Sequence, residues 1–264
     1  MVPFLGSDYR VFDLGQEISK AMPEWPAHPP FVFGLLRRHG DTVHADGTCG
    51  ANEILVMSGH TATHIDALGH VSQDGRFHGG ADAFETQKGE HGLRSHGVDQ
   101  VGPIVGRGVL LDLYRLFGGP LEPGYEVTVS DLERAQEQAG CEVREGDTVV
   151  LRTGWGAFWH TDKPRYLSMG RGQPGPGVAA ARWLAERKIR ATGSDTFVYE
   201  CFGPAPNAMP VHSVLLVEHG IYIMENLNLE ALGDAGVGEF LFVALPLPLK
   251  GATGSPIRPV AIAR

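Results

Sequence analysis

The sequence has few cysteines, no long hydrophobic run and no basic cluster, and each absence excludes a class of protein. Its three cysteines, Cys49, Cys141 and Cys201, are far apart and lack Cys-x-x-Cys spacing, which excludes a disulfide framework and a thiolate zinc site. No stretch approaches the ~20 apolar residues of a membrane span. The first twenty residues lack the apolar core of a signal peptide. We therefore expect a cytoplasmic protein with free thiols and no membrane contact.

The charge balance excludes another class of partner. Lysine and arginine total 22 against 31 aspartates and glutamates, which gives a formal charge of −9. A negative field repels polyanions, and no local group of basic residues reverses it. Nucleic acid is therefore not an expected partner.

Motifs of several common enzyme classes are also missing. The chain has no Gly-x-Ser-x-Gly elbow, no Walker loop and no His-Glu-x-x-His helix. A Gly-x-Gly-x-x-Gly pattern occurs at residues 170–175, but Pro174 and Pro176 interrupt it and no strand leads into it. The pattern therefore does not predict a dinucleotide site.

What is present indicates one α/β domain over residues 1–264, because no linker or internal repeat divides the chain. Ser130 and Glu133 form a capping box that predicts a helix over 131–139, ended by Gly140. Apolar spacing predicts further helices over 178–187 and 213–218. Strand-like runs bounded by turn residues cover 108–113, 148–152, 221–224 and 240–245. These patterns leave open whether the sheet is open or closed.

The most informative segment is His60-Thr61-Ala62-Thr63-His64-Ile65-Asp66-Ala67-Leu68-Gly69-His70. Its three histidines and its aspartate occupy even positions, so on an extended backbone they share one face. Neutral imidazole and carboxylate suit Zn²⁺ or Mn²⁺, and the lack of thiolates favours a catalytic site. Such an ion activates water and polarises a carbonyl, as hydrolysis of an amide or ester requires.

Histidines and aromatic residues also have roles that involve no ligand. A lone histidine usually lies at the surface or in a satisfied core position, and we expect this of His28, His39, His91 and His96. Period-two spacing also arises by coincidence. We expect His78 to lie on a loop surface. Trp25, flanked by prolines, is placed either against a planar substrate or in a packed core.

The histidine segment resembles the signature His-x-Gly-Thr-His-x-Asp-x-Pro-x-His of the cyclase-like metal hydrolases, a family that includes bacterial kynurenine formamidases and isatin hydrolases. The chain departs from it at two spacer positions, where Ala62 replaces glycine and Leu68 replaces proline. Four later segments also resemble family elements: Arg152-Thr153-Gly154-Trp155, Ala191 to Thr196, Val211 to Leu227 and Gly254 to Arg258.

The resemblance implies a swivelling β/β/α domain that assembles as a homodimer or homotetramer. It implies that His60, His64 and Asp66 bind a first metal, and that Asp66 bridges to a second ion held by His212 and Glu225. His70 would be the acid/base residue. Without the resemblance, His212 would be interpreted as a residue at a helix start and Glu225 as an exposed carboxylate, rather than as metal ligands.

The expected function is therefore hydrolysis of a C–N bond in a small cyclic or N-acyl amide, isatin-like or N-formylkynurenine-like, with one or two Mn²⁺ or Zn²⁺ ions and Trp25 against the substrate. The alternatives are a metal-dependent cyclase, dehydratase or lactone hydrolase, and a metal-binding homologue without activity. The two spacer departures, Ala62 and Leu68, leave the substrate open.

Overall fold

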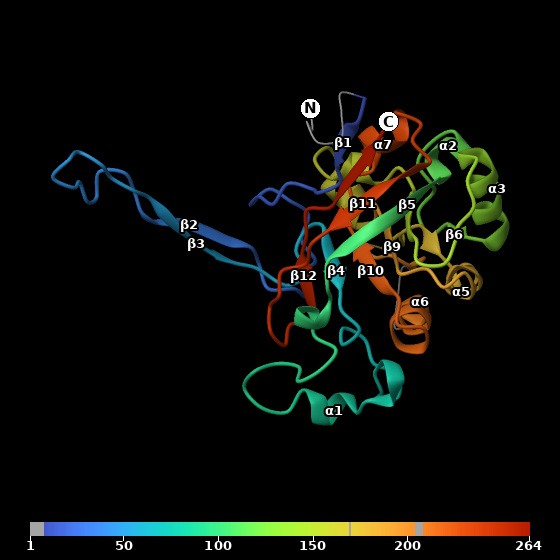
Figure 1. The fold of residues 1–264 in the computed structure, drawn as a ribbon, viewed down its shortest axis with the longest axis horizontal. Helices are drawn as coiled ribbons and strands as arrows, with labels where there is room; N and C mark the ends of the chain where they lie inside the picture. Colours follow the sequence, from blue (N-terminus) through green and yellow to red (C-terminus); the bar gives the residue numbers. More distant parts are fainter. Residues whose placement is uncertain (1–7, 169, 204–207) are drawn as a thin grey trace.

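A computed structural model describes residues 8–168, 170–203 and 208–264. Nine strands form one curled sheet (Figure 1). Their spatial order is β1 (Arg10–Asp13), β13 (Val260–Ala263), β11 (Glu239–Ala244), β5 (Ile104–Asp112), β7 (Thr148–Arg152), β9 (Ala191–Ser194), β10 (Tyr222–Glu225), β4 (His64–Asp66) and β12 (Gly254–Pro256). The expected α/β class is confirmed, and the sheet is mixed.

The four strands in the middle of the sheet are parallel, and the strands on both sides of them are antiparallel. Buried parallel strands read as continuous apolar runs, which is why 148–152 and 221–224 were recognisable. Strand β5 starts four residues before the predicted run, and Leu113 already belongs to the next helix.

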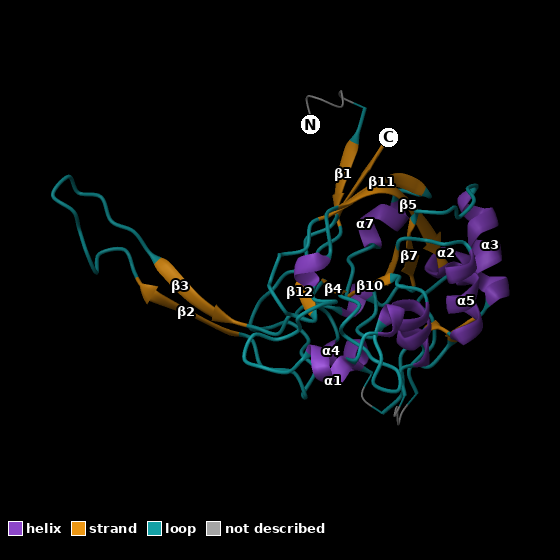
Figure 2. Cartoon of the chain, turned by 60° about the horizontal axis from the view of Figure 1, so that its bottom comes forward, coloured by secondary structure: helices purple, strands orange, loops and turns teal. Residues whose placement is uncertain are grey.

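Helices cover the sheet on both faces, and most of them are short (Figure 2). They are α1 (Ala83–Thr86), α2 (Leu113–Phe117), α3 (Val129–Ala139), α4 (Lys163–Leu167), α5 (Val178–Glu186), α6 (Pro210–His212) and α7 (Glu230–Asp234). Short 3₁₀ turns occupy η1 (His78–Gly80), η2 (Val98–Gln100) and η3 (Gly156–Phe158), and α6 continues as a π-helix, η4 (Ser213–Glu218).

The three predicted helices are present, and one predicted cap is wrong. Helix α3 starts two residues early, because Thr128 rather than Ser130 is its cap and forms the capping box with Asp131. The threonine hydroxyl accepts from the N3 amide while the N3 carboxylate accepts from the cap amide, so an aspartate serves as well as a glutamate. Gly140 ends the helix as expected, at φ 67°.

Two apolar clusters lie on opposite faces of the sheet. Leu111, Leu151 and Ile223 face the helices α3, α5 and η4, whereas Val150, Met224 and Phe242 face the other way. Alternate residues of β7 and β10 thus serve different clusters, as the period of a strand requires. These two buried layers fix the ends of β4 and β10, where the histidine segment and Glu225 lie.

Two further sheets have two strands each. Strand β6 (Glu126–Val127) pairs with β8 (Gly175–Pro176), and β2 (Val32–Arg37) pairs with β3 (Asn52–Val56). The β2–β3 hairpin projects far from the rest of the molecule (Figures 1 and 2).

None of the helices in the described part of the chain is both long enough and apolar enough to cross a bilayer. Cys49, Cys141 and Cys201 are free thiols, as their spacing predicted.

Candidate metal centre

Strand β4 carries His64 at its start and Asp66 at its end, between β10 and β12. Glu225, the last residue of β10, lies directly opposite His64 in the antiparallel register. Side chains of directly opposed residues share a face of the sheet. The pairing of β4 with β10 therefore joins the two sequence motifs, 161 positions apart, at one point.

The period-two spacing predicted a continuously extended segment from His60 to His70, and the structure differs from this prediction. Only 64–66 form a strand, because Ala62 turns the chain at φ 50° and a backbone bond from His70 N to the Ala67 carbonyl closes a turn after it. The two turns, rather than a single strand face, bring His60 and His70 back over Asp66.

His60 fits because the neighbouring strand has a glycine beside it. A Cβ at Gly254 would lie 2.6 Å from Cε1 of His60, a distance that carbon atoms do not reach. Nε2 of His60 lies 3.0 Å from the Thr253 hydroxyl, which leaves Nδ1 facing Asp66 at 2.7 Å. The Gly254 segment, which resembles a family element, thus forms a wall of the site.

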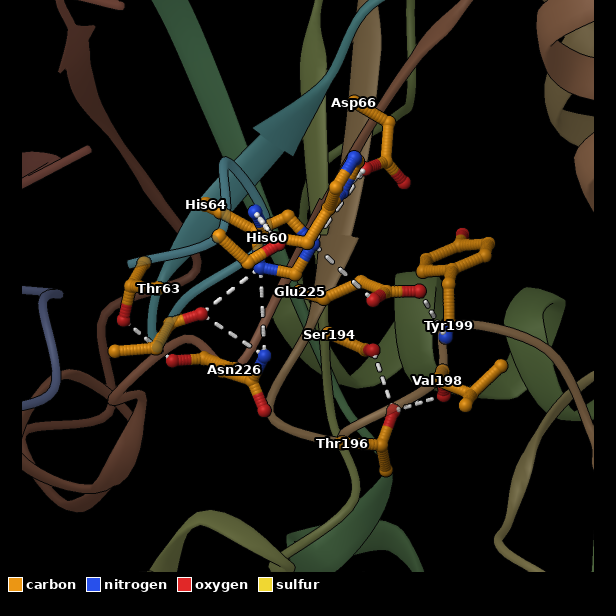
Figure 3. Close-up of polar contacts among 12 residues, drawn as sticks. His60, Thr63, His64, Asp66, Ser194, Thr196, Val198, Tyr199, Glu225 and Asn226 are labelled. Carbon is orange, nitrogen blue, oxygen red and sulfur yellow. Dashed lines mark hydrogen bonds and ion pairs between the residues drawn. The ribbon is translucent and has the colours of Figure 1, made fainter. Parts of the chain in front are cut away.

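The rings of His64 and His212 are also fixed by a hydrogen bond at one ring nitrogen. Nδ1 of His64 donates to the Ala62 carbonyl at 2.9 Å, and Nδ1 of His212 donates to Glu200 at 2.6 Å. Nε2 of His64 then points at Asp66 and Glu225 (Figure 3). Nε2 of His212 likewise lies beside Glu225. A neutral imidazole whose one nitrogen is a fixed donor presents a lone pair at the other, which is the form that binds metals.

The free ring nitrogens and the two carboxylates lie within a few ångströms of one another. His64 Nε2 is 3.4 Å from both Asp66 and Glu225, and His212 Nε2 is 3.4 Å from Glu225 and 3.7 Å from Asp66. These separations exceed hydrogen bonds but are typical of ligands around a common ion. Two groups of ligand atoms lie close enough together to hold an ion: His60, His64 and Asp66, and Asp66, His70 and His212.

Asp66 is the residue whose surroundings point most clearly to a cation site. Its side chain is 1% exposed, and neither oxygen has a hydrogen-bond partner among the described residues, although His60 Nδ1 approaches it. A buried carboxylate without hydrogen bonds costs several kcal/mol, so such groups persist where a positive charge or an ion compensates them. The donor set of nitrogen and carboxylate oxygen, without thiolate, fits a divalent metal ion.

The pKa values of the cluster show how strongly its groups interact. Burial alone would lower the pKa of His64 and His212, but the carboxylates beside them outweigh it and raise both to about 10. Burial would likewise raise the pKa of Glu225, yet His212 and His64 lower it to about 2. Without a metal, the cluster therefore holds protons between its imidazoles and carboxylates.

His70 behaves differently from its neighbours. Burial, together with the positive charge of His60 and His212, lowers its pKa to about 4 against the opposing effect of Asp66. Its ring centroid lies 4.1 Å from that of His60. A neutral imidazole at the edge of the cluster is suited to accept a proton at neutral pH.

A cavity of about 620 Å³ opens above the cluster. Its floor contains His60, His64, His70, His212 and Glu225. Its apolar wall includes Trp25, which stacks on Phe197 with 5.5 Å between ring centroids, and Phe202, which meets Trp25 edge-on. The volume is typical of a small-molecule site. Six of the seven predicted site residues thus line one cavity, and the seventh, Asp66, contacts two of them, His60 and His64.

Sequence reasoning missed two residues at this cavity. His28 was expected at the surface or in a satisfied core position, but it lines the cavity with its ring 6.1 Å from that of His60, and burial lowers its pKa. Its position three residues after Trp25, among the same prolines, was an available signal. Glu200, which is 2% exposed and holds His212, had no signal in its local sequence. His78, expected on a loop surface, is half-buried and donates to the Val217 carbonyl.

Two of the segments that resemble the family, Arg152 to Trp155 and Ala191 to Thr196, hold the loop that carries Glu200. The Asp195 carboxylate accepts from the Thr153 amide and hydroxyl and from the Gly154 amide, at 2.7–2.8 Å. Further along this loop, the Tyr199 amide donates to Glu225 at 2.8 Å (Figure 3). The loop therefore orients ligands on two different elements.

Comparison with known proteins agrees with this geometry. The model of the Cyclase family, described as "Putative cyclase", matches residues 12–200. A kynurenine formamidase of Bacillus cereus is 26% identical over 257 residues, covering 94% of this chain and 95% of the relative. An isatin hydrolase of Roseibium aggregatum is 27% identical over 269 residues, covering 98% and 88%.

Solved structures show the same fold. A crystal structure described as a novel cyclase superposes with a TM-score of 0.88 at 28% identity, covering 98% of this chain and 90% of that one. An isatin hydrolase bound to the product analogue thioisatinate superposes with a TM-score of 0.75 at 23% identity, covering 98% and 94%. The fold and the cluster define a metal-site protein of the α/β class. The chain belongs to the Cyclase family.

Proposed function

We propose that this chain is a metal-dependent hydrolase that cleaves a C–N bond of a small amide. The observation that carries the proposal is the convergence of three imidazole nitrogens and two buried carboxylates on the floor of an aromatic-walled cavity. Structural metal sites are closed by their ligands, whereas this cluster opens onto a cavity of substrate size.

His60, His64 and Asp66 would hold a first ion, and His212 and Glu225, which lie beside Asp66, would hold a second. Zn²⁺ and Mn²⁺ both accept this donor set, and one or two ions would bind. When bound, such an ion lowers the pKa of water and polarises a carbonyl.

The chain's own residues complete the reaction. A ring nitrogen of His70, neutral because its pKa is about 4, would take the proton of the attacking water and pass it to the leaving nitrogen. Trp25 and Phe197 would hold a planar substrate against the floor. Phe202 and Met209 would shield the reacting carbonyl from bulk water.

The relatives guide the choice of substrate. One bears the name kynurenine formamidase and another isatin hydrolase, so each name refers to an aromatic amide, one open-chain and one cyclic. A cavity of about 620 Å³ with a stacked tryptophan accommodates either. We propose an N-formylkynurenine-like or isatin-like amide as the substrate.

The test is metal removal and refilling followed by assays on N-formylkynurenine, isatin and other small amides. Chelator-treated protein should lose hydrolysis, and Mn²⁺ or Zn²⁺ should restore it. His64→Ala should be inactive, whereas His219→Ala, at a half-exposed histidine outside the cluster, should keep wild-type activity. Full activity in the metal-free protein or in His64→Ala would refute the proposal.

The name of the family gives weight to a second reaction, a metal-dependent cyclisation, dehydration or lactone opening on the same cluster. Product mass separates the two, since amide hydrolysis adds one water and splits or opens the C–N bond. A catalytically silent homologue is disfavoured because His70 and all five proposed ligands are present.

Three broader expectations accompany this proposal. The single nine-stranded sheet supports treating residues 1–264 as one domain. The cytoplasmic location stays a prediction. A homodimer or homotetramer stays the expected assembly.

A further inference from the structure

Gln73, an exposed residue, lines the cavity without belonging to the proposed metal cluster or to the aromatic wall. It opens a tight turn, in which the Gln73 amide donates to the Arg76 carbonyl at 3.0 Å and the Arg76 amide donates back at 2.9 Å. The two central residues, Asp74 and Gly75, have φ 50° and 71°, as a type I′ turn requires. The turn therefore fixes the backbone of Gln73 just after His70.

A hydrogen bond from η4 fixes the side chain of Gln73 as well. Its Oε1 accepts from the Ser213 hydroxyl at 3.1 Å, and Ser213 directly follows the proposed ligand His212. A carboxamide whose oxygen is occupied by a donor presents its two N–H groups in the remaining directions. No acceptor among the described residues takes a bond from Nε2. Nε2 is therefore available to donate to a molecule in the cavity, close to the groups that would carry out the reaction.

The cavity offers a substrate neither lysine nor arginine. Neither type is present among the described residues of its lining, and the residues outside the described ranges contain neither. Glu200, a lining carboxylate outside the proposed cluster, already accepts from His212 and from the Val211 amide. A carboxylate on the substrate would leave water without a lysine or arginine to pair with, which costs free energy. The acceptor that suits Nε2 of Gln73 is therefore a neutral one, such as a carbonyl oxygen.

We propose that Gln73 is a specificity-determining residue of the hydrolysis proposed above, on which this inference rests. Its Nε2 donates to a neutral carbonyl oxygen that the substrate carries beside the amide to be cleaved. The stacked rings of Trp25 and Phe197 accept any planar amide, whereas this donor favours those with a second carbonyl. Because Gln73 is exposed, water replaces a missing acceptor, and the expected selectivity is that of one neutral hydrogen bond, about 2–10-fold.

Two aryl amides that differ by one ketone test the proposal. Formanilide has no second carbonyl, and ortho-acetylformanilide carries one beside the amide. The two differ in intrinsic reactivity, so each variant is compared with the wild type on the same substrate. Gln73→Met keeps the size of the side chain and removes the donor. It should raise KM for the ketone about 2–10-fold with little change in kcat, and it should leave both constants for formanilide unchanged.

Two further variants separate the donor from its position, measured by the ratio of kcat/KM for the ketone and for formanilide. Gln73→Glu keeps the oxygen that accepts from Ser213 but offers no N–H, so its ratio should fall at least as far as that of Gln73→Met. Ser213→Ala keeps the donor but releases the carboxamide, so its ratio should fall less. A wild-type ratio in Gln73→Glu would overturn the proposal, because an oxygen rather than an N–H would then face the substrate.

A third substrate tests the charge of the acceptor. The carboxylate analogue, ortho-formamidobenzoate, carries a negative group where the other amide carries its ketone. The wild type should bind it with a higher KM than the ketone, because the lining has no lysine or arginine to pair with it. A lower KM for the carboxylate would contradict the neutral acceptor.

Gln138→Met, at an exposed glutamine of α3 outside the cavity, is the matched control and should behave as the wild type on all three amides. Metal content and circular dichroism should be the same in all variants, because backbone bonds hold the turn at Gln73 and no proposed ligand is changed. Hydrolysis of the ketone by Gln73→Met with wild-type constants would overturn this inference alone. A metal-loaded wild type that hydrolyses no amide would overturn the proposed function, and this inference with it.

Discussion

Oε1 of Glu200 lies 2.6 Å from Nδ1 of His212, and both side chains are almost completely buried. The second oxygen of Glu200 accepts from the Val211 amide at 2.7 Å, so the carboxylate cannot rotate away. This arrangement forces the proton of His212 onto Nδ1 and leaves Nε2 for a metal. Glu200 is thus a positioning residue for a ligand on a different element of the fold.

Glu200→Gln should weaken metal binding by about 10–100-fold, as is usual when the carboxylate behind a ligating histidine is removed. The amide still accepts or donates a hydrogen bond, so the fold should survive. Competition with a chelator measures the affinity. Glu218→Gln, which changes an exposed carboxylate bound to Arg182, is the control and should bind metal as the wild type does. Unchanged affinity in Glu200→Gln would show that the contact does not orient His212.

His70→Ala should lower kcat by about 10²–10⁴-fold, the usual effect of removing an acid/base group. Metal content should stay at the wild-type level if His70 only moves protons. His70 also lies close enough to Asp66 and His212 to bind an ion together with them, so a loss of metal in this variant would be informative. A variant that loses a full equivalent of metal by elemental analysis would make His70 a ligand instead.

Metal affinity should rise with pH. Without metal, His64 and His212 have pKa values of about 10, so both are protonated at neutral pH and an ion must displace these protons. Below pH 10, the apparent affinity should increase about tenfold per pH unit for each proton displaced. Calorimetry in buffers of different ionisation enthalpy counts the protons released. Affinity that is flat between pH 6 and 8 would contradict the ion-paired state of the cluster.

The sequence predicted the chemistry of the site better than its shape. His60, His64 and Asp66 could be chosen because metal ligands must be particular residue types, whereas His212 and Glu225 came from the resemblance to the family. Their convergence depends on the pairing of β4 with β10, a contact between strands about 160 residues apart that local periodicity does not encode. Glu200 was missed because its contact with His212 likewise depends on the tertiary fold and not on a local sequence pattern.

The departure at Ala62 shows a further limit. The family signature has glycine there, and the structure explains it, since residue 62 has φ 50°, where a Cβ costs about 1–2 kcal/mol. The methyl of Ala62 is buried with Trp159 and Tyr166, which offsets part of that cost. The β2–β3 hairpin, by contrast, was not predicted, because none of the strand-like runs recognised in the sequence lies within residues 32–56.

Trp25→Ala should raise KM by about 2–10-fold with little change in kcat on an aromatic amide. Stacking on Phe197 places the indole along the cavity wall, away from the reacting groups, so its contact contributes equally to the ground state and the transition state. Trp25→Phe, which keeps a flat ring, should lose much less. Steady-state kinetics with an aromatic and an aliphatic amide separate the effects, since the aliphatic substrate gains nothing from stacking. An equal fall in kcat on both substrates would show instead that Trp25 supports the metal cluster.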